Sequence, residues 1–200
     1  MISTAQQIAV FGGAFDPFHN GHVAAIKLLL SQPDISKVLV VPSGDRPDKH
    51  GVSRAAERYE MTYRGVQSAF GDDPRIEVSD IQSRGAVGFS TIDLVTYARQ
   101  HYGMKVAVII GRELLGDLPQ WHRAEELRQQ ARFLVLERPG AKPDCVLSGW
   151  QVEFLPPFGE SGFAISSTEL RRRLASGDGC DGLMPPVVRD YCISRGLYQR

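Results

Sequence analysis

The chain has 200 residues, of which 42% are hydrophobic and 23% are charged, proportions that are ordinary for a globular domain. Its 23 basic residues balance its 23 acidic residues, so no overall positive field favours nucleic acid as a partner. No apolar run approaches the roughly 20 residues that cross a bilayer, and the N-terminus lacks the pattern of a secretion signal, so we expect no membrane partner.

The hydrophobic pattern predicts strands that alternate with helices along the chain. In chain order, it predicts a strand at 8–11, a helix at 20–31, a strand at 37–41, a helix at 54–70, a strand at 75–78, a helix at 91–102, a strand at 106–110, a helix at 123–130, strands at 133–136 and 151–155, and helices at 167–175 and 187–194. Gly71 and Gly103 follow two of these helices, as glycines that end helices do.

This alternation predicts a doubly wound α/β fold, with a mainly parallel sheet of five to six strands and helices on both faces. No repeat or low-complexity tract divides the chain, so we expect a single domain over residues 1–200. Ligands of such sheets bind beyond the carboxyl ends of the strands. Segments 12–22, 42–50 and 111–121, and the segment that leads to Ser166, are predicted to meet there.

The stretch 12–22 reads Gly-Gly-Ala-Phe-Asp-Pro-Phe-His-Asn-Gly-His and joins the first predicted strand to the first helix. Gly12 and Gly13 let the backbone turn tightly and approach a phosphate, while the helix start offers backbone N–H groups to an anion. An ordinary tight turn is the alternative. The spacing matches neither the dinucleotide fingerprint of dehydrogenases nor the P-loop.

His19 and His22 admit three interpretations, namely a metal pair, solvated loop side chains or phosphate donors. A catalytic zinc needs about three protein ligands, and no third candidate has a matching spacing, so we expect no metal site. Asn20 is the expected N-cap, which would place His22 in the first helical turn.

A second polar segment, Ser166 to Arg173, opens the penultimate predicted helix. The spacing of Ser166 and Glu169 predicts a capping box, and the same helix start can offer hydroxyl and N–H groups to an anion. Arg172 and Arg173 are expected on a solvated helix face. The cysteines, Cys145, Cys180 and Cys192, lack metal-site spacing, which favours reduced thiols in a cytoplasmic protein.

Stretch 12–22 resembles the GGxFDPxHxGH signature of class I nucleotidylyltransferases and, more narrowly, of the bacterial nicotinate-mononucleotide adenylyltransferase family. Residues 165–171, Ile-Ser-Ser-Thr-Glu-Leu-Arg, resemble that family's ISSTxIR motif, and the similarity continues through 183–188 to 196–198. The resemblance implies a Rossmann-like nucleotidylyltransferase domain whose C-terminal helices, 166–200, complete the ATP site.

The resemblance implies an enzyme of NAD biosynthesis that joins ATP to nicotinate mononucleotide, giving deamido-NAD and pyrophosphate. Its partners would be ATP and a pyridine mononucleotide, and Mg²⁺ would be held mainly by substrate phosphates. His19, His22 and Arg171 match the residues that act on the phosphates. The full set expected to bind ATP is Gly12, Gly13, Phe15, His19, His22, Ser166, Ser167, Thr168 and Arg171.

The expected mononucleotide side comprises Lys49, Ser90, Glu113 and Trp121, the tryptophan lying beside the pyridine ring in the family. The chain departs from the family pattern here. Glu113 replaces the usual Asp, Gly-Phe-Ser at 88–90 replaces Ser-Tyr-Thr, and only Lys49 is retained from Pro-Pro-His-Lys.

Two other residues have open roles at this stage. Arg58 resembles a family arginine, with an exposed helix charge as its alternative. Asp16 is interpreted as a loop-shaping residue.

Three alternatives stay open from the sequence. The acceptor could be nicotinamide mononucleotide or another phosphate, and CTP could replace ATP. The third alternative is a nucleotide-binding regulator without turnover, which the joint presence of His19, His22 and Arg171 disfavours.

Overall fold

The computed structural model describes residues 6–45, 52–137, 147–156 and 165–199, and shows one six-stranded sheet. The strands are β1 (Gln7–Gly13), β2 (Ile35–Pro42), β3 (Ile76–Val78), β4 (Lys105–Gly111), β5 (Ala131–Leu136) and β6 (Val152–Leu155). They lie in the order β3-β2-β1-β4-β5-β6, and every neighbouring pair is parallel. The predicted doubly wound, Rossmann-like α/β fold is therefore confirmed. The strand order reverses between β1 and β4, the place where such sheets bind ligands.

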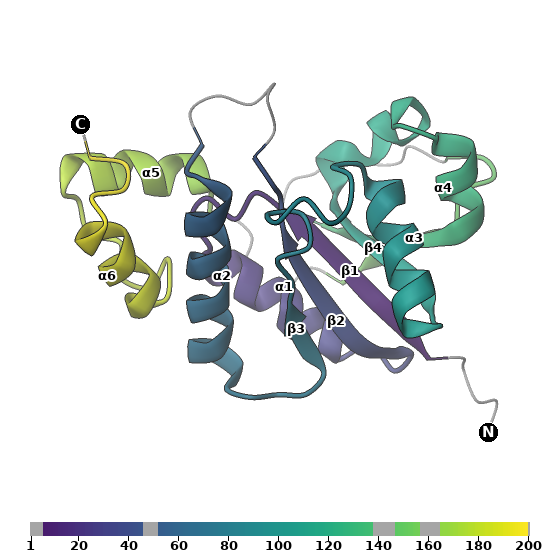
Figure 1. The fold of residues 1–200 in the computed structure, drawn as a ribbon, viewed down its shortest axis with the longest axis horizontal. Helices are drawn as coiled ribbons and strands as arrows, with labels where there is room; N and C mark the ends of the chain where they lie inside the picture. The colour runs from purple at the N-terminus through teal and green to yellow at the C-terminus, as the bar shows by residue number, and fades with distance from the viewer. Residues whose placement is uncertain (1–5, 46–51, 138–146, 157–164, 200) are drawn as a thin grey trace.

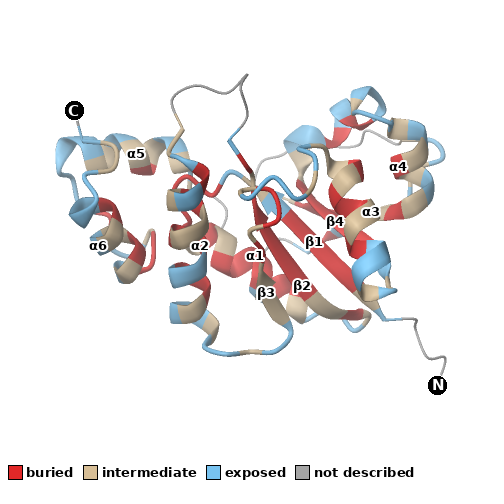
Figure 2. Cartoon of the chain, viewed as in Figure 1, coloured by how far each residue is buried: buried red, intermediate tan, exposed pale blue. Residues whose placement is uncertain are grey.

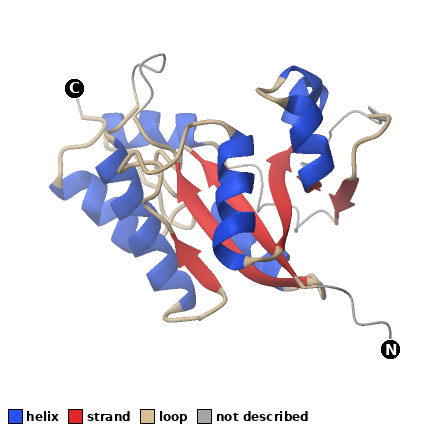
Figure 3. Cartoon of the chain, turned by 45° about the vertical axis from the view of Figure 1, so that its right-hand side comes forward, coloured by secondary structure: helices blue, strands red, loops and turns tan. Residues whose placement is uncertain are grey.

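The helices cover both faces of the sheet (Figures 1 and 3). They are α1 (Asn20–Leu30), α2 (Ala55–Phe70), α3 (Thr91–Tyr102), the 3₁₀ helix η1 (Arg112–Gln120), α4 (Ala124–Gln130), α5 (Ser167–Ser176) and α6 (Pro186–Ser194). In Figure 1, α3 and α4 lie on one side of the sheet, and α2, α5 and α6 lie on the other. None of the helices in the described ranges is long and apolar enough to cross a membrane.

Alternation along the strands builds two hydrophobic cores, one on each face, which Figure 2 shows as buried strands between half-exposed helices. In β1, Ala9 and Phe11 join the core beneath α1, α2, α5 and α6, whereas Ile8 and Val10 join the core beneath α3, η1 and α4. Successive side chains of a strand point to opposite faces. The central strands are therefore apolar along most of their length.

Helix ends follow their local sequence at α3. Ser90 caps its start by accepting a hydrogen bond from the Asp93 N–H, and Gly103 ends it in the left-handed conformation, with φ 64°. Helix η1 was not predicted, because segment 111–121 was placed at the site without a secondary structure. Buried Leu115 and Leu118 hold it against the sheet.

Two of the cysteines lie in the described part of the chain. Cys180 and Cys192 are free, buried thiols, in agreement with the prediction of reduced cysteines. Cys145 lies outside the described residues.

Candidate active site

A cavity of about 350 Å³ opens where the carboxyl ends of β1, β4 and β5 meet the first turns of α1 and α5. It lies at the position expected for a ligand of a doubly wound sheet. Its lining comprises Phe11, Gly12, Gly13, Phe15, His19, Gly21, His22, Ala25, Gly111, Glu113, Leu136, Ile165, Ser166, Ser167 and Thr168. The chain thus brings together two segments about 150 positions apart, both of which the sequence had singled out.

The loop after β1 folds back on itself through Phe15. Phe15 is buried and has φ 50°, a left-handed conformation that is uncommon for a bulky residue. A side chain on Gly13 would come within 3.0 Å of the Phe15 ring, so the fold-back needs glycine there. The ring meets His22 edge-on, with centroids 4.8 Å apart. The loop is therefore packed, with its backbone close to the cavity.

The two histidines stack at the start of α1, with ring centroids 3.6 Å apart and planes 21° apart. The backbone N–H of His19 donates to Nδ1 of His22 at 3.1 Å. Because Nδ1 accepts this bond, the proton of the neutral His22 ring belongs on Nε2, and Nε2–H is a donor. Both rings line the cavity, where such donors suit phosphate oxygens.

The expected N-cap of α1 was wrong by one residue. His19 is the N-cap and Asn20 is the first helical residue, although His22 does lie in the first turn as expected. The side chain of Asn20 instead donates to the Gly182 carbonyl at 2.9 Å. Asn20 therefore ties α1 to the segment that precedes α6.

The start of α5 forms the opposite wall, with Ser166 as its N-cap. The capping box predicted for Ser166 and Glu169 is wrong, because the carboxylate of Glu169 lies against Arg172 and Arg173 at 2.8–2.9 Å. The hydrogen bond from Arg172, followed by that from Arg173, lowers the pKa of Glu169 to about 2. An ionised carboxylate bound to two guanidinium groups gains more there than at a neutral N–H.

Arg171 does not line the cavity. Its guanidinium donates to the main-chain carbonyl of Asp16 at 2.8 Å and to Thr168 Oγ1 at 3.2 Å. Arg171 thereby joins α5 to the loop after β1. Arg172 is exposed, as expected of a solvated helix face, but it is paired with Glu169 and Asp178.

Arg58 is buried, at 1% exposure, so the alternative of an exposed helix charge is wrong. Its guanidinium donates to the Ser53 carbonyl, Ser43 Oγ, the Gly44 carbonyl and Asp45 Oδ1 at 2.7–3.2 Å. These bonds satisfy a charge that burial would otherwise make costly. Arg58 therefore holds both ends of the loop between β2 and α2.

The residues expected on the mononucleotide side are not gathered in one place. Glu113 lines the cavity, with its carboxylate folded over Gly111. Ser90 is engaged in capping α3, with its hydroxyl on Asp93. Trp121 ends η1 and packs edge-on against Phe133, with centroids 6.4 Å apart, away from the cavity lining. Lys49 lies outside the described residues.

Six lining residues were not in the predicted set. Two lie on α1, one lies directly before α5, and three lie toward the carboxyl ends of β1, β4 and β5. They are Gly21, Ala25, Ile165, Phe11, Gly111 and Leu136. The strand-end position was a usable signal for Gly111 and Leu136, because these sheets bind ligands there.

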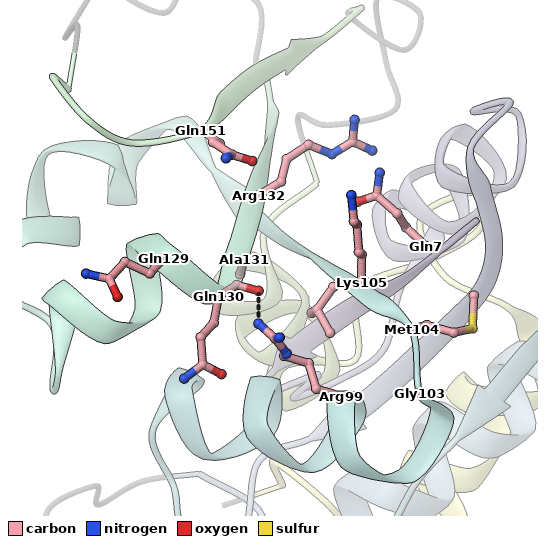
Figure 4. A pocket seen from close by; sticks show the side chains of 11 residues that line it. Gln7, Arg99, Gly103, Met104, Lys105, Gln129, Gln130, Ala131, Arg132 and Gln151 are labelled. Atoms are coloured by element: carbon pink, nitrogen blue, oxygen red, sulfur yellow. Dashed lines mark hydrogen bonds between the residues drawn. The ribbon is translucent and has the colours of Figure 1, made fainter. Parts of the chain in front are cut away.

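A second cavity, of about 500 Å³, lies at the amino ends of β1, β4 and β5 (Figure 4). Two of its three basic side chains, Arg99 and Arg132, have structural partners, and the third, Lys105, is exposed. Arg99 donates to the Gln130 carbonyl at the end of α4, and Arg132 pairs with Asp34 and Glu153 at 2.8 and 3.0 Å. Helices α3 and α4 both end here, and cations near helix C-termini offset the partial negative charge. This cavity is a poor anion site.

Within the described ranges, no group of three or more His, Cys, Asp or Glu side chains could hold a metal ion. The first cavity instead presents a histidine pair, two serines and a threonine. Such donors suit phosphate oxygens better than a bare cation.

Comparisons with known proteins show the family of the chain. The family model described as cytidylyltransferase-like matches residues 10–173. A probable nicotinate-nucleotide adenylyltransferase of Desulfitobacterium hafniense is 31% identical over 97% of this chain and 96% of its own length. One of Solibacter usitatus is 33% identical over 96% of this chain and 99% of its own.

Solved structures show a similar fold. The Plasmodium falciparum nicotinic acid mononucleotide adenylyltransferase complexed with NaAD superposes with a TM-score of 0.79. It is 24% identical and covers 96% of this chain and 97% of its own. The same enzyme complexed with APC gives a TM-score of 0.75 at 23% identity, with the same coverage.

Proposed function

The chain belongs to the nicotinate-nucleotide adenylyltransferase family of cytidylyltransferase-like proteins, and on that basis we propose that it transfers the adenylyl group of ATP to nicotinate mononucleotide. The products are deamido-NAD and pyrophosphate, in the biosynthesis of NAD. The observation that carries the proposal is the cavity in which the histidine pair of α1 faces Ser166, Ser167 and Thr168 of α5.

In the proposed reaction, a phosphate oxygen of the mononucleotide attacks the α-phosphorus of ATP. The new P–O bond forms as the bond to the β-phosphate oxygen breaks, and pyrophosphate leaves with that electron pair. The attacking oxygen is already anionic near neutral pH, so no protein base needs to remove a proton. Catalysis then depends on alignment and on stabilising negative charge around the α-phosphate.

The residues of the cavity divide this work. His22, whose Nε2 carries the proton, and His19 donate to phosphate oxygens, and the backbone of Gly12 and Gly13 allows the phosphates close approach. The N–H groups at the start of α5 and the hydroxyl of Ser166 would bind the same anion, while the Ser167 hydroxyl donates to the Pro17 carbonyl at 3.3 Å. Arg171 adds positive charge from its position on Asp16 and Thr168.

Mg²⁺ completes the proposed site. The ion would be held mainly by phosphate oxygens and water, because Glu113 is the one carboxylate among the lining residues that the structure describes. Such an ion would supply positive charge to the phosphate oxygens that this site binds.

We further infer that residues 1–200 form a single nucleotidylyltransferase domain of the cytoplasm, and that helices within 166–200 complete its ATP site. Lys49, Ser90, Glu113 and Trp121 remain the proposed mononucleotide side. Because Trp121 and Ser90 lie away from the cavity lining, their part in this proposal requires the pyridine moiety to extend beyond it.

The amide acceptor is the second candidate, and Glu113 favours it. A carboxylate that reached the pyridine substituent would repel nicotinate and accept a hydrogen bond from nicotinamide. We retain nicotinate, because similarity to its adenylyltransferases extends over 97% of the chain.

The test is a pyrophosphate-release assay with four pairs of substrates, ATP or CTP with nicotinate or nicotinamide mononucleotide, each with and without Mg²⁺. We expect the highest kcat/KM for ATP with nicotinate mononucleotide and no release without Mg²⁺. A higher kcat/KM with nicotinamide mononucleotide would change the proposed acceptor and leave the proposed adenylyl transfer standing. Binding of ATP without turnover on either acceptor would support a regulator instead.

A further inference from the structure

The end of the chain is hydrogen bonded to the loop after β1. The hydroxyl of Tyr198 donates to Oδ1 of Asp16 at 2.6 Å, across 182 positions of sequence. Asp16 is 1% exposed and lies three residues before His19. Tyr198 thus reaches residues 12–22, here called the histidine loop because they include His19 and His22, without lining the cavity itself.

Asp16 is a junction between distant segments. Its carboxylate also accepts from the Ser53 N–H at 3.3 Å, and Arg171 lies 3.9 Å from it while binding its main-chain carbonyl. Ser53 is held from its other side by Arg58. Asp16 therefore joins the histidine loop, the segment before α2, helix α5 and the C-terminal segment.

Backbone conformation singles out the same contact. In the described ranges, three non-glycine residues have positive φ, namely Phe15 at 50°, Arg123 at 54° and Tyr198 at 66°. Phe15 precedes Asp16 in the chain, and Tyr198 is the hydrogen-bond partner of Asp16. Bulky residues keep this unfavourable conformation only where the surroundings enforce it. Since the Phe15 ring packs on His22, a shift of Asp16 would reach the histidine pair.

We propose that Tyr198 is a positioning residue for adenylyl transfer, holding the histidine loop in place through its hydrogen bond to Asp16. The role rests on the proposed function, because the group being positioned is the phosphate-binding loop. Burial, and then the neighbouring Asp16, raises the pKa of Tyr198, so its hydroxyl remains a donor throughout the neutral range.

Tyr198→Phe tests the proposal, because it removes the hydroxyl and keeps the ring. Tyr191→Phe is the matched control. Its hydroxyl also donates to a carboxylate, that of Glu57, but on α2 and away from the cavity lining. We expect Tyr198→Phe to lower kcat by about tenfold through misalignment, with a smaller change in KM for ATP, while Tyr191→Phe keeps normal kcat.

Amide hydrogen exchange of residues 11–22, without substrate, provides a second measurement. Exchange there should be faster in Tyr198→Phe than in the wild type or in Tyr191→Phe. Normal kcat in Tyr198→Phe would overturn the proposal, as would an equal fall in both variants or a fall without faster exchange of the loop. If the wild type releases no pyrophosphate, the proposed function fails, and the exchange comparison alone decides whether Tyr198 holds the loop.

Discussion

At the scale of single residues, the stacked imidazoles define the donor that faces the cavity. His22 accepts the His19 N–H through Nδ1, so the proton of its neutral ring is on Nε2. Protonation of Nδ1 would break that bond and place a positive charge against the His19 ring, whose centroid lies 3.6 Å away. The neutral form of His22 is therefore the one that the helix start supports.

Replacing His22 by alanine should lower kcat by roughly 10²-fold, the scale of losing one donor to the transition state. The comparison is His101→Ala, an exposed histidine on α3 that stacks on Tyr97. Steady-state kinetics and circular dichroism of both variants check this expectation. Normal turnover in His22→Ala would reduce the residue to a helix-cap role, and loss of helicity would mark it as structural.

Trp121→Ala should raise KM for the mononucleotide several-fold and spare KM for ATP, since an aromatic pair is worth about 0.5–1.5 kcal/mol beyond burial. Trp121 also packs against Phe133, so the melting temperature is measured alongside. A lower melting temperature with both KM values unchanged would show that this tryptophan serves packing and not the pyridine ring.

At the scale of helices and strands, α2 packs closely against the loop after β1 at a glycine. Helix α2 contains Gly65, and a methyl group there would overlap the Phe18 ring and approach Val188 at 3.2 Å. Phe18 belongs to the histidine loop and is fully buried against α2. The glycine is therefore needed for the close approach of the loop to the helix.

Gly65→Ala should lower the free energy of unfolding by about 1–2 kcal/mol. Overpacking costs about 1–3 kcal/mol, which exceeds the gain of up to about 1 kcal/mol in helix propensity. Gly116→Ala is the control, because a side chain there meets nothing within 4 Å. Urea unfolding measures both, and a more stable Gly65→Ala protein would show that Phe18 can move aside at no cost.

Helices α2 and α6 are joined by an acid-sensitive contact. Glu57 on α2 accepts from Tyr191 on α6 and from Arg195, the latter at 2.9 Å. These bonds, that from Arg195 first, lower the pKa of Glu57 below its usual 4.5. A carboxyl whose pKa is lower in the folded protein than in the unfolded chain stabilises the fold at pH values above the unfolded pKa. This stabilisation is lost as the pH falls through the folded pKa.

The melting temperature of the wild type should therefore exceed that of Glu57→Gln at pH 7. The difference should shrink as pH falls below about 4.5 and disappear once Glu57 is protonated in the folded protein. Glu125→Gln is the reference, because that side chain is 80% exposed and such surface pairs contribute little. A difference that persisted unchanged at low pH would assign the effect to shape and not to charge.

At the scale of the whole molecule, ligand binding should be visible as stability. A non-hydrolysable ATP analogue at 100 times its Kd would stabilise the fold by about 2.7 kcal/mol, which corresponds to a rise in melting temperature of roughly 5–10 °C. His22→Ala should show a smaller rise at the same concentration. An equal rise in both proteins would place the nucleotide away from His22.

The layered fold could be predicted from the sequence, because buried parallel strands and amphipathic helices leave distinct periodicities. Helix η1 was missed, since Gly116 and Pro119 within Arg112–Gln120 read as loop and the burial of Leu115 and Leu118 is a tertiary effect. Strand order was likewise outside the reach of local pattern.

The site was predictable to different extents on its two sides. The residues of 12–22 and 166–168 carry their own motif chemistry, and the structure brings them into one cavity. Glu169 was misread and the role of Arg58 stayed open, because their partners are chosen by packing and not by spacing. Ser90 precedes Asp93 at the spacing of a capping box, so its capping role was readable from the sequence, whereas the packing of Trp121 on Phe133 was not.

The cavity has one wall from 11–25 and another from 165–168. Chains emerge from the ribosome N-terminus first, so the histidine loop is made early and waits for its opposite wall. On the proposed function, nucleotide would find a complete cavity only after residues 165–168 have been made. A chain that terminated before α5 would contain all six strands of the sheet but lack one wall of the cavity. Nucleotide would then not protect it from proteolysis.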